Sequence, residues 1–179
     1  MLSSDNLAHL HHASSPRPEN QRETCGEVVS LIPALRAFAR TFHTRTEDAD
    51  DLVQETLMRA LANLDKFQSG TRLKSWLFTI MRNTFCTRAN KGKREIVGLE
   101  PAISATLVSE PRQDLRARLS EVERAMSRLP SHQREILTLI VLLGESYEDA
   151  AQICGCAVGT VKSRLNRARQ QLYRELGEA

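Results

Sequence analysis

The residues with the clearest chemical potential lie near the end of the chain, in the basic stretch GTVKSRLNRARQQL at residues 159–172. Between residues 158 and 174 there are five Lys or Arg side chains and no Asp or Glu. Cationic side chains bind phosphate, and an arginine or an asparagine can bond the edge of a base through two atoms at once. This stretch therefore has the chemistry to recognise a polyanion and to read bases.

A helix of this sequence has an apolar face and a polar face, because successive residues are rotated by about 100°. The apolar face consists of Val161, Leu165, Ala168 and Leu172. The opposite face consists of Ser163, Asn166, Arg167 and Gln170, with Lys162, Arg169 and Arg164 at its edges. A short helix and a turn at Gly155 precede it, which is typical of a helix-turn-helix whose second helix enters the DNA major groove. Arg167 can donate two hydrogen bonds to a guanine, Asn166 has the groups to pair with an adenine but its base is left open, and Lys162 and Arg164 can hold phosphates.

Two other segments are strongly charged. Residues 47–55 contain five acids and no base, and residues 72–94 contain seven bases and no acid. The net charge of the whole chain is only +3, so the distribution of charge carries more information than the total. Two basic segments far apart in the chain indicate contact with a polyanion at two places.

The periodicity of apolar residues predicts an all-α fold of two small helical domains joined by a flexible linker. We expect a flexible arm at 1–24, a first domain at 25–94, a linker at 95–114 and a second domain at 115–179. Small residues and prolines without a sustained period indicate the linker. We also expect the two domains to become compact only when a partner holds both.

Local signals place several helices of this fold. A helix is expected from Val28, with Pro33 tolerated in its first turns. Polar residues ahead of apolar runs predict helix N-caps at Thr46, Ser131 and Ser146, the last with Asp149 in a capping box. One amphipathic helix of about five turns is predicted by a stripe at steps of three and four. That stripe consists of Ala49, Leu52, Val53, Leu57, Ala60, Leu61 and Leu64.

The motifs of the chain resemble those of the extracytoplasmic-function (ECF) sigma factors of bacterial RNA polymerase, in order and in spacing. They read DADDLVQETLMRAL, LKSWLFTIMRNTFCTRANKGKR and LPSHQREILTLIVLLGESYEDAAQICGCAVGTVKSRLNRARQQL. The resemblance runs from about Leu31 to Leu172, and residues 70–95 resemble the subgroup that directs a general stress response. It implies a region 2 domain at 25–94, a region 4 domain at 115–179, and a protein that binds core polymerase and directs promoter-specific initiation.

The resemblance implies three functional surfaces. The surface that docks on core polymerase would consist of Asp50, Asp51, Leu52, Gln54, Glu55 and Arg59. The surface that captures the melted −10 strand would include Arg72, Lys74, Trp76, Asn83 and Arg88, and Arg82 would also hold phosphates there. The surface that reads the −35 duplex would consist of Lys162, Ser163, Arg164, Asn166 and Arg167.

The resemblance to the stress-response subgroup also implies a partner: a small helical anti-sigma factor that sequesters the protein. Two other functions stay open: a free-standing regulator that binds operators, and a sigma mimic that sequesters an anti-sigma factor. An enzyme is not expected, because the chain has no Walker motif, GxGxxG or HExxH. No cofactor, metal or membrane partner is expected. Cys154 and Cys156 are expected to be reduced thiols in a cytoplasmic protein.

Overall fold

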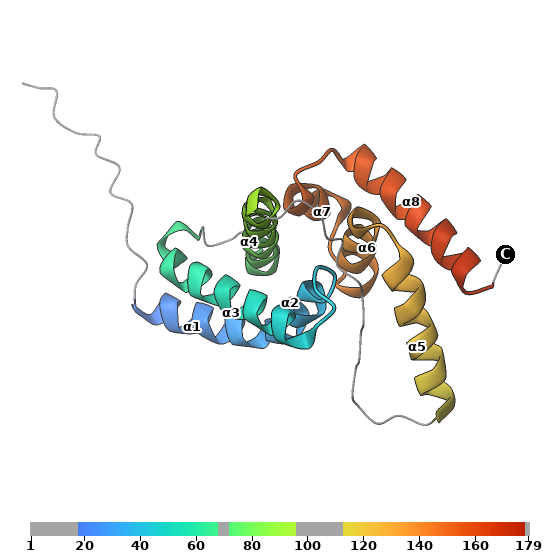
Figure 1. Cartoon of the computed structure of the whole chain (residues 1–179). Helices are drawn as coiled ribbons and strands as arrows, with labels where there is room; N and C mark the ends of the chain where they lie inside the picture. The colour runs from blue at the N-terminus through green and yellow to red at the C-terminus, as the bar shows by residue number, and fades with distance from the viewer. Residues whose placement is uncertain (1–17, 68–71, 96–112, 178–179) are drawn as a thin grey trace, which may run out of the picture.

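A computed structural model describes residues 18–67, 72–95 and 113–177, and in these ranges the chain is helical and has no strand (Figure 1). This confirms the predicted all-α fold. The helices described fall into two groups, one over residues 18–95 and one over residues 113–175. The predicted linker lies almost wholly outside the described residues.

The first half consists of α1 (Pro18–Ser30), α2 (Ile32–Ala39), α3 (Thr46–Ala62), a short 3-10 helix η1 (Leu64–Lys66) and α4 (Leu73–Glu95). Its core forms where α2 and α3 pack against α4. The rings of Phe38 and Phe78 meet there with centroids 4.9 Å apart, and both side chains are fully buried. Burying each such side chain contributes about 1.5–3 kcal/mol, so these aromatic and aliphatic contacts fix the position of α4.

The start of the first half differs from the prediction. The expected arm at 1–24 is wrong from Pro18 onward, because α1 begins at that residue. Proline suits the first position of a helix, where its φ angle is already helical and no N–H is required. The single helix expected from Val28 is divided at Leu31, since Pro33 supplies no N–H to the helical ladder.

Two of the three predicted N-caps are wrong by one residue. The N-cap of α3 is Arg45 rather than Thr46, and that of α6 (Ser131–Leu137) is Pro130 rather than Ser131. The apolar stripe of α3 is confirmed in its centre, but Leu61 is exposed. Thr56 is buried instead, because its hydroxyl donates a hydrogen bond to the carbonyl of Leu52 and so needs no water.

The second half consists of α5 (Gln113–Arg128), α6, a π-helical turn η2 (Thr138–Leu142), α7 (Tyr147–Cys154) and α8 (Val158–Glu175). α8 packs against α6 and α7. Its buried residues are Val161, Leu165 and Ala168, as the helical periodicity predicts. Figure 1 shows α8 along the outer side of the molecule, with α7 between it and α4.

The two halves pack directly against each other through α4 and α7. A further link comes from Arg134 of α6, whose Nε donates to the carbonyl of Thr41 at 3.0 Å and whose Nη1 donates to the carbonyl of Ser127. Burial lowers the pKa of this guanidinium from its ordinary value. The expectation that the halves meet only when a partner holds them is therefore wrong for this structure. The nearly buried carboxylates of Glu135 and Glu145 find cations on the first half, and the carbonyl of Thr41 finds a donor on the second.

Candidate nucleic-acid interface

The helix-turn-helix is formed by α7, a turn at Gly155 and α8. Ser146 caps α7: its hydroxyl accepts a hydrogen bond from the backbone N–H of Asp149 at 3.0 Å, which confirms the predicted capping residue. Gly155 ends α7 with a φ of +60°, a conformation that costs a glycine little because it has no Cβ. The chain then turns and α8 begins, so the N-terminal turns of α8 lie beside the end of α7.

The predicted reading face of α8 is open to solvent. Lys162, Ser163, Asn166 and Arg167 are exposed, and Arg164 is half-buried with its Nη1 4.0 Å from the sulfur of Cys156. The ammonium of Lys162 lies 5.8 Å from the ring centroid of Tyr147, within the range of a cation–π contact. Four of the five predicted −35 residues therefore lie on the exposed side of α8, and Arg164 lies partly buried beside Cys156.

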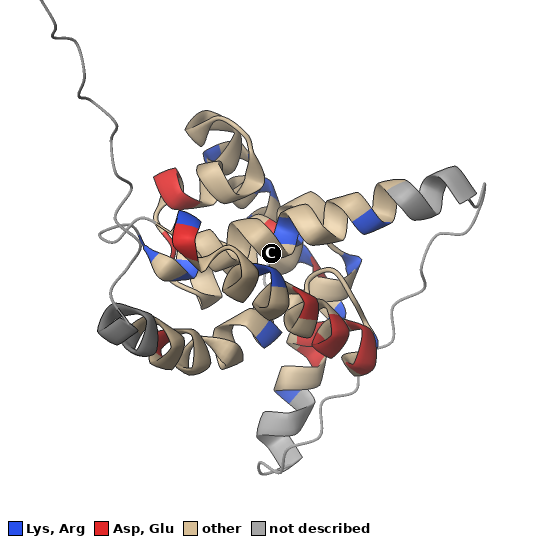
Figure 2. Ribbon diagram, turned by 90° about the vertical axis from the view of Figure 1, so that its left-hand side faces the viewer, with Lys and Arg blue, Asp and Glu red and all other residues tan. Residues whose placement is uncertain are grey.

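The basic side chains of α4 lie in a different environment. Of the predicted −10 residues, Asn83 is exposed, and Trp76 is half-buried against Phe67 with ring centroids 5.3 Å apart. Arg72 and Lys74 point to the second half of the molecule. In Figure 2, positions of Lys and Arg (blue) and of Asp and Glu (red) adjoin in the middle of the molecule.

Two cations at the start of α4 contact acids of the second half. Arg72 Nη1 lies 2.7 Å from Oδ2 of Asp149, and Lys74 Nζ lies 2.9 Å from Oε1 of Glu145. Ser75 Oγ donates to the other oxygen of Glu145 at 2.8 Å. Lys74 Nζ also donates to the carbonyl of Leu143. These contacts join positions about 70 residues apart in the chain.

A third cation, Arg82, lies more than two turns farther along α4 and contacts Glu135 of α6, with 2.5 Å between Nε and Oε1. Burial by itself would lower the pKa of Arg82, but the charge and the hydrogen bond of Glu135 raise it above its ordinary value. The side chains of Glu135 and Glu145 are only 8% and 3% exposed, so neither carboxylate has much water as an alternative partner.

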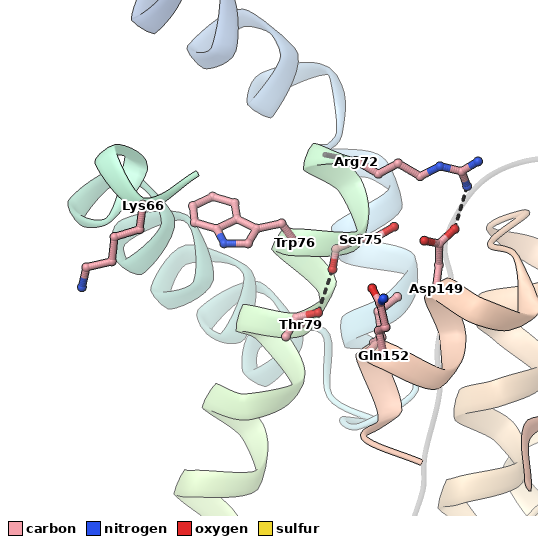
Figure 3. A pocket seen from close by; sticks show the side chains of 8 residues that line it. Lys66, Arg72, Ser75, Trp76, Thr79, Asp149 and Gln152 are labelled. Carbon is pink, nitrogen blue, oxygen red and sulfur yellow. Dashed lines mark hydrogen bonds and ion pairs between the residues drawn. The ribbon is translucent and has the colours of Figure 1, made fainter. Parts of the chain in front are cut away.

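A cavity of about 320 Å³ lies between the halves next to these ion pairs (Figure 3). In Figure 3 the indole of Trp76 points to the side of Lys66, while Arg72 reaches across to Asp149. The lining comes from the first half and from α7: Lys66, Arg72, Ser75, Trp76, Thr79, Asp149, Gln152 and Ile153. Trp76 therefore borders this cavity with its indole directed toward the side of Lys66, whereas Arg72 reaches toward α7.

The acidic helix α3 presents a mixed surface. Asp51 and Gln54 are exposed, and Asp50 lies 3.0 Å from Nε of Arg36. Leu52 is fully buried in the core of the first half, so we remove it from the predicted docking residues. Its position three residues after Ala49 turns it to the inside with the apolar stripe.

One carboxylate links the predicted docking and −10 surfaces. Glu55 contacts Arg59 on its own helix, with 2.6 Å between Oε1 and Nη2. Glu55 also forms an ion pair with Arg88 of α4. These predicted residues of two different surfaces therefore belong to one network of charges.

Comparison with known families matches both halves of the chain. Residues 28–95 match the model of sigma-70 region 2, and residues 119–172 match that of sigma-70 region 4. The chain is 50% identical over 146 residues to the ECF RNA polymerase sigma factor EcfG of Rhodopseudomonas palustris, covering 82% of this chain and 81% of that protein.

The chain is an ECF sigma factor.

Two solved structures are similar to this sigma factor over most of its length. One is the sigma factor RpoE in complex with the anti-sigma factor NepR from Bartonella quintana, with a TM-score of 0.75 and 42% identity over 87% of this chain and 98% of that chain. The other is CnrH in complex with the cytosolic domain of CnrY, with a TM-score of 0.65 and 28% identity over 92% of each chain.

As a member of this family, the sigma factor directs promoter-specific initiation of transcription by core RNA polymerase. The region 2 match runs from the last residues of α1 to the end of α4, and the region 4 match runs from within α5 to within α8. Within the described ranges, no group of three or more His, Cys, Asp or Glu side chains could hold a metal ion. In the same ranges, no helix is long and apolar enough to cross a membrane.

The sequence prediction missed the acids that contact α4. Asp149 was assigned only a capping role, and Glu135 and Glu145 had none. One signal could have drawn attention to the two glutamates. They lie at the two ends of the apolar run ILTLIVLLG. A carboxylate next to a buried apolar segment is itself partly buried and needs a cation as a partner.

Proposed function

We propose that this sigma factor reads the −35 element with α8, captures the melted −10 strand with α4 and docks on core polymerase with α3. The observation that carries the proposal is the exposed polar face of α8, on which Ser163, Asn166 and Arg167, with Lys162 at the edge, lie opposite the buried Val161, Leu165 and Ala168. A helix-turn-helix uses the first turns of its second helix to contact base edges in the major groove.

Each side chain of α8 has a specific role in this proposal. Arg167 donates two hydrogen bonds to a guanine, and Asn166 contacts the edge of a neighbouring base. Lys162 and Arg164 hold phosphates and so position the helix without selecting a sequence. The cation–π contact with Tyr147 supports the role of Lys162, because it limits the positions that a long side chain can adopt.

The −10 role of α4 is supported by its charge and by Trp76. Single strands are held by cations along the backbone and by aromatic side chains that stack on bases. Arg72, Lys74, Arg82 and Arg88 supply the cations, and the half-buried indole of Trp76 borders the cavity between the halves.

The docking role of α3 is supported by an exposed stripe of acidic, polar and apolar side chains: Asp51, Gln54, Met58 and Leu61. Such a mixture is typical of protein interfaces, where apolar contacts contribute affinity and charges set orientation. Asp50, Glu55 and Arg59 complete the surface through their ion pairs.

We further propose that the regulon is a general stress response, since the EcfG relative shares half of the aligned residues. An anti-sigma factor then controls the protein in the cytoplasm, as NepR is bound to the similar RpoE of Bartonella quintana. The anti-sigma partner is expected to be small and helical.

Run-off transcription tests the proposal. The purified full chain is added to core polymerase on promoter fragments from its own genome, with core polymerase alone as control. Specific transcripts that disappear when the −35 or the −10 element is changed support both DNA-contact assignments. Co-elution with core polymerase but no transcript contradicts them. Sequence-specific duplex binding without co-elution favours an operator-binding regulator.

The anti-sigma assignment has its own test. A small helical anti-sigma protein encoded near the gene is added to the same transcription assay in increasing amounts. Loss of transcripts at a one-to-one ratio supports sequestration. Unchanged transcription, together with no co-elution of the two proteins, contradicts it.

A further inference from the structure

We propose that the contact between α4 and the second half is autoinhibitory. In the free chain, three carboxylates occupy the cations that would otherwise hold phosphates of the −10 strand. The carboxylates are Glu135, Glu145 and Asp149. The inference rests on the proposed −10 role of α4.

The carboxylates use the donors that a phosphate needs. Asp149 accepts from Nη1 of Arg72, and Glu145 accepts from Nζ of Lys74. Carboxylate and phosphate oxygens are equivalent partners for such cations, so an acid and a DNA strand compete for the same N–H groups. Arg72 remains largely exposed on its other side, which leaves its remaining donors available to an approaching strand.

The contact also borders the aromatic side chain of the proposed strand site. Gln152 and Ile153 of α7 line the cavity that borders Trp76. The indole itself is directed toward the side of Lys66 and away from α7. The second half therefore competes with the strand through its charges, at Arg72, Lys74 and Arg82.

The strengths of the three ion pairs fit a contact that holds the halves and can still open. Arg72 and Asp149 form an exposed pair, which water and salt weaken. Glu135 and Glu145 are nearly buried, and their cations are less than one-third exposed. Opening returns every charge to water, so no partner is left buried and unpaired.

The reading face of α8 lies outside this contact. Lys162, Ser163, Asn166 and Arg167 are exposed in the same structure, and the acids that contact α4 belong to α6, α7 and the turn between them. The closed form can thus contact duplex DNA but not the melted strand. It follows that recognition of the −35 duplex precedes engagement of the −10 strand.

The test neutralises the carboxylates without changing their shape. The full-length variant E135Q/E145Q/D149N is compared with wild type in binding to a fluorescein-labelled single-stranded DNA of about 15 nucleotides, followed by fluorescence anisotropy. We expect the variant to bind about tenfold more tightly, because the competent open form is no longer a minor species. The control is E148Q, which removes one carboxylate charge from an exposed position of α7.

Small-angle scattering of the same proteins supplies the second measurement. The triple variant should have a larger radius of gyration than wild type, and E148Q should not. Unchanged affinity for the single strand overturns the inference, whether or not the variant expands. Tighter binding without expansion overturns it too, since lost negative charge would then explain the result.

Failure of the proposed −10 role is recognised separately. Adding Lys74→Ala or Arg72→Ala to the triple variant should weaken single-strand binding severalfold. If the triple variant expands but these changes have no effect, α4 is not the strand site, and the inference falls together with that proposed role.

Discussion

The basic surfaces of α4 and α8 have similar residue types but lie in different environments. Both helices carry closely spaced cations without acids on the same segment. The cations of α8 face solvent, whereas Arg72, Lys74 and Arg82 of α4 face carboxylates of the other half. A basic segment therefore indicates what a helix can bind, but its availability depends on which acids the fold places opposite.

Removal of a cation from the side of α4 that faces the second half should have the largest effect. Arg82→Ala leaves Glu135 without a cation for as long as the halves stay packed, so we expect the free energy of unfolding to fall by about 1–3 kcal/mol. Urea unfolding followed by circular dichroism measures the change. The matched variant Arg167→Ala, on the open surface, should stay within about 0.5 kcal/mol of wild type. Equal stability losses in the two variants would remove the distinction between the surfaces.

The same arginine-to-alanine change on the exposed face of α8 should weaken DNA binding instead of stability. Arg167→Ala is expected to weaken binding to the −35 duplex by about 1–3 kcal/mol and to relax selection at a single base pair. Competition binding with duplexes that vary at each −35 position measures both effects. A uniform loss over all sequences would show that Arg167 contacts phosphate rather than a base.

A smaller effect is expected from a phosphate contact of the open surface. Lys162→Ala should weaken duplex binding about equally for all sequences and reduce the slope of log K against log salt by about one. Titrations at several salt concentrations give the slope, with Lys66→Ala as a control in the other half. A slope unchanged from wild type would contradict the phosphate contact.

The smallest expected effect is the dependence of stability on pH near neutrality. It should involve the half that contains α4 and not α8. Burial lowers the pKa of His43 below 6.5; Asp48 opposes this and Arg88 adds to it. His43 packs against Phe85 of α4, with ring centroids 5.5 Å apart, whereas α8 contains no histidine. As the pH falls through about 6.5, the unfolded chain takes up this proton before the folded chain, so stability should decrease.

Melting temperatures at pH 7.5 and 5.5 measure this dependence. His43→Gln should reduce the difference between the two pH values, because the buried titrating group is gone. His132→Gln is the control, since that side chain is exposed. An equal reduction in both variants would exclude a specific role of His43.

Local patterns predicted much of the site. The apolar spacing of Val161, Leu165 and Ala168 fixes which side of α8 is buried, and so which side chains remain for DNA. The prediction for Leu52 was wrong because a motif shared with a family suggested a contact. The apolar stripe of α3 places this side chain in the core. The N-caps of α3 and α6 were displaced by one residue because several polar residues adjoin each helix start.

The sequence by itself determined the helices, the family and the residues available for DNA recognition, since each depends on neighbours within a few turns. Only the tertiary structure decided that Arg72, Lys74 and Arg82 contact Asp149, Glu145 and Glu135. These pairs join positions 53 to 77 residues apart, and no local periodicity specifies which distant acid a given cation meets. That choice follows from how the packed cores orient α4 against α6 and α7, and from the cost of leaving a buried carboxylate without a partner.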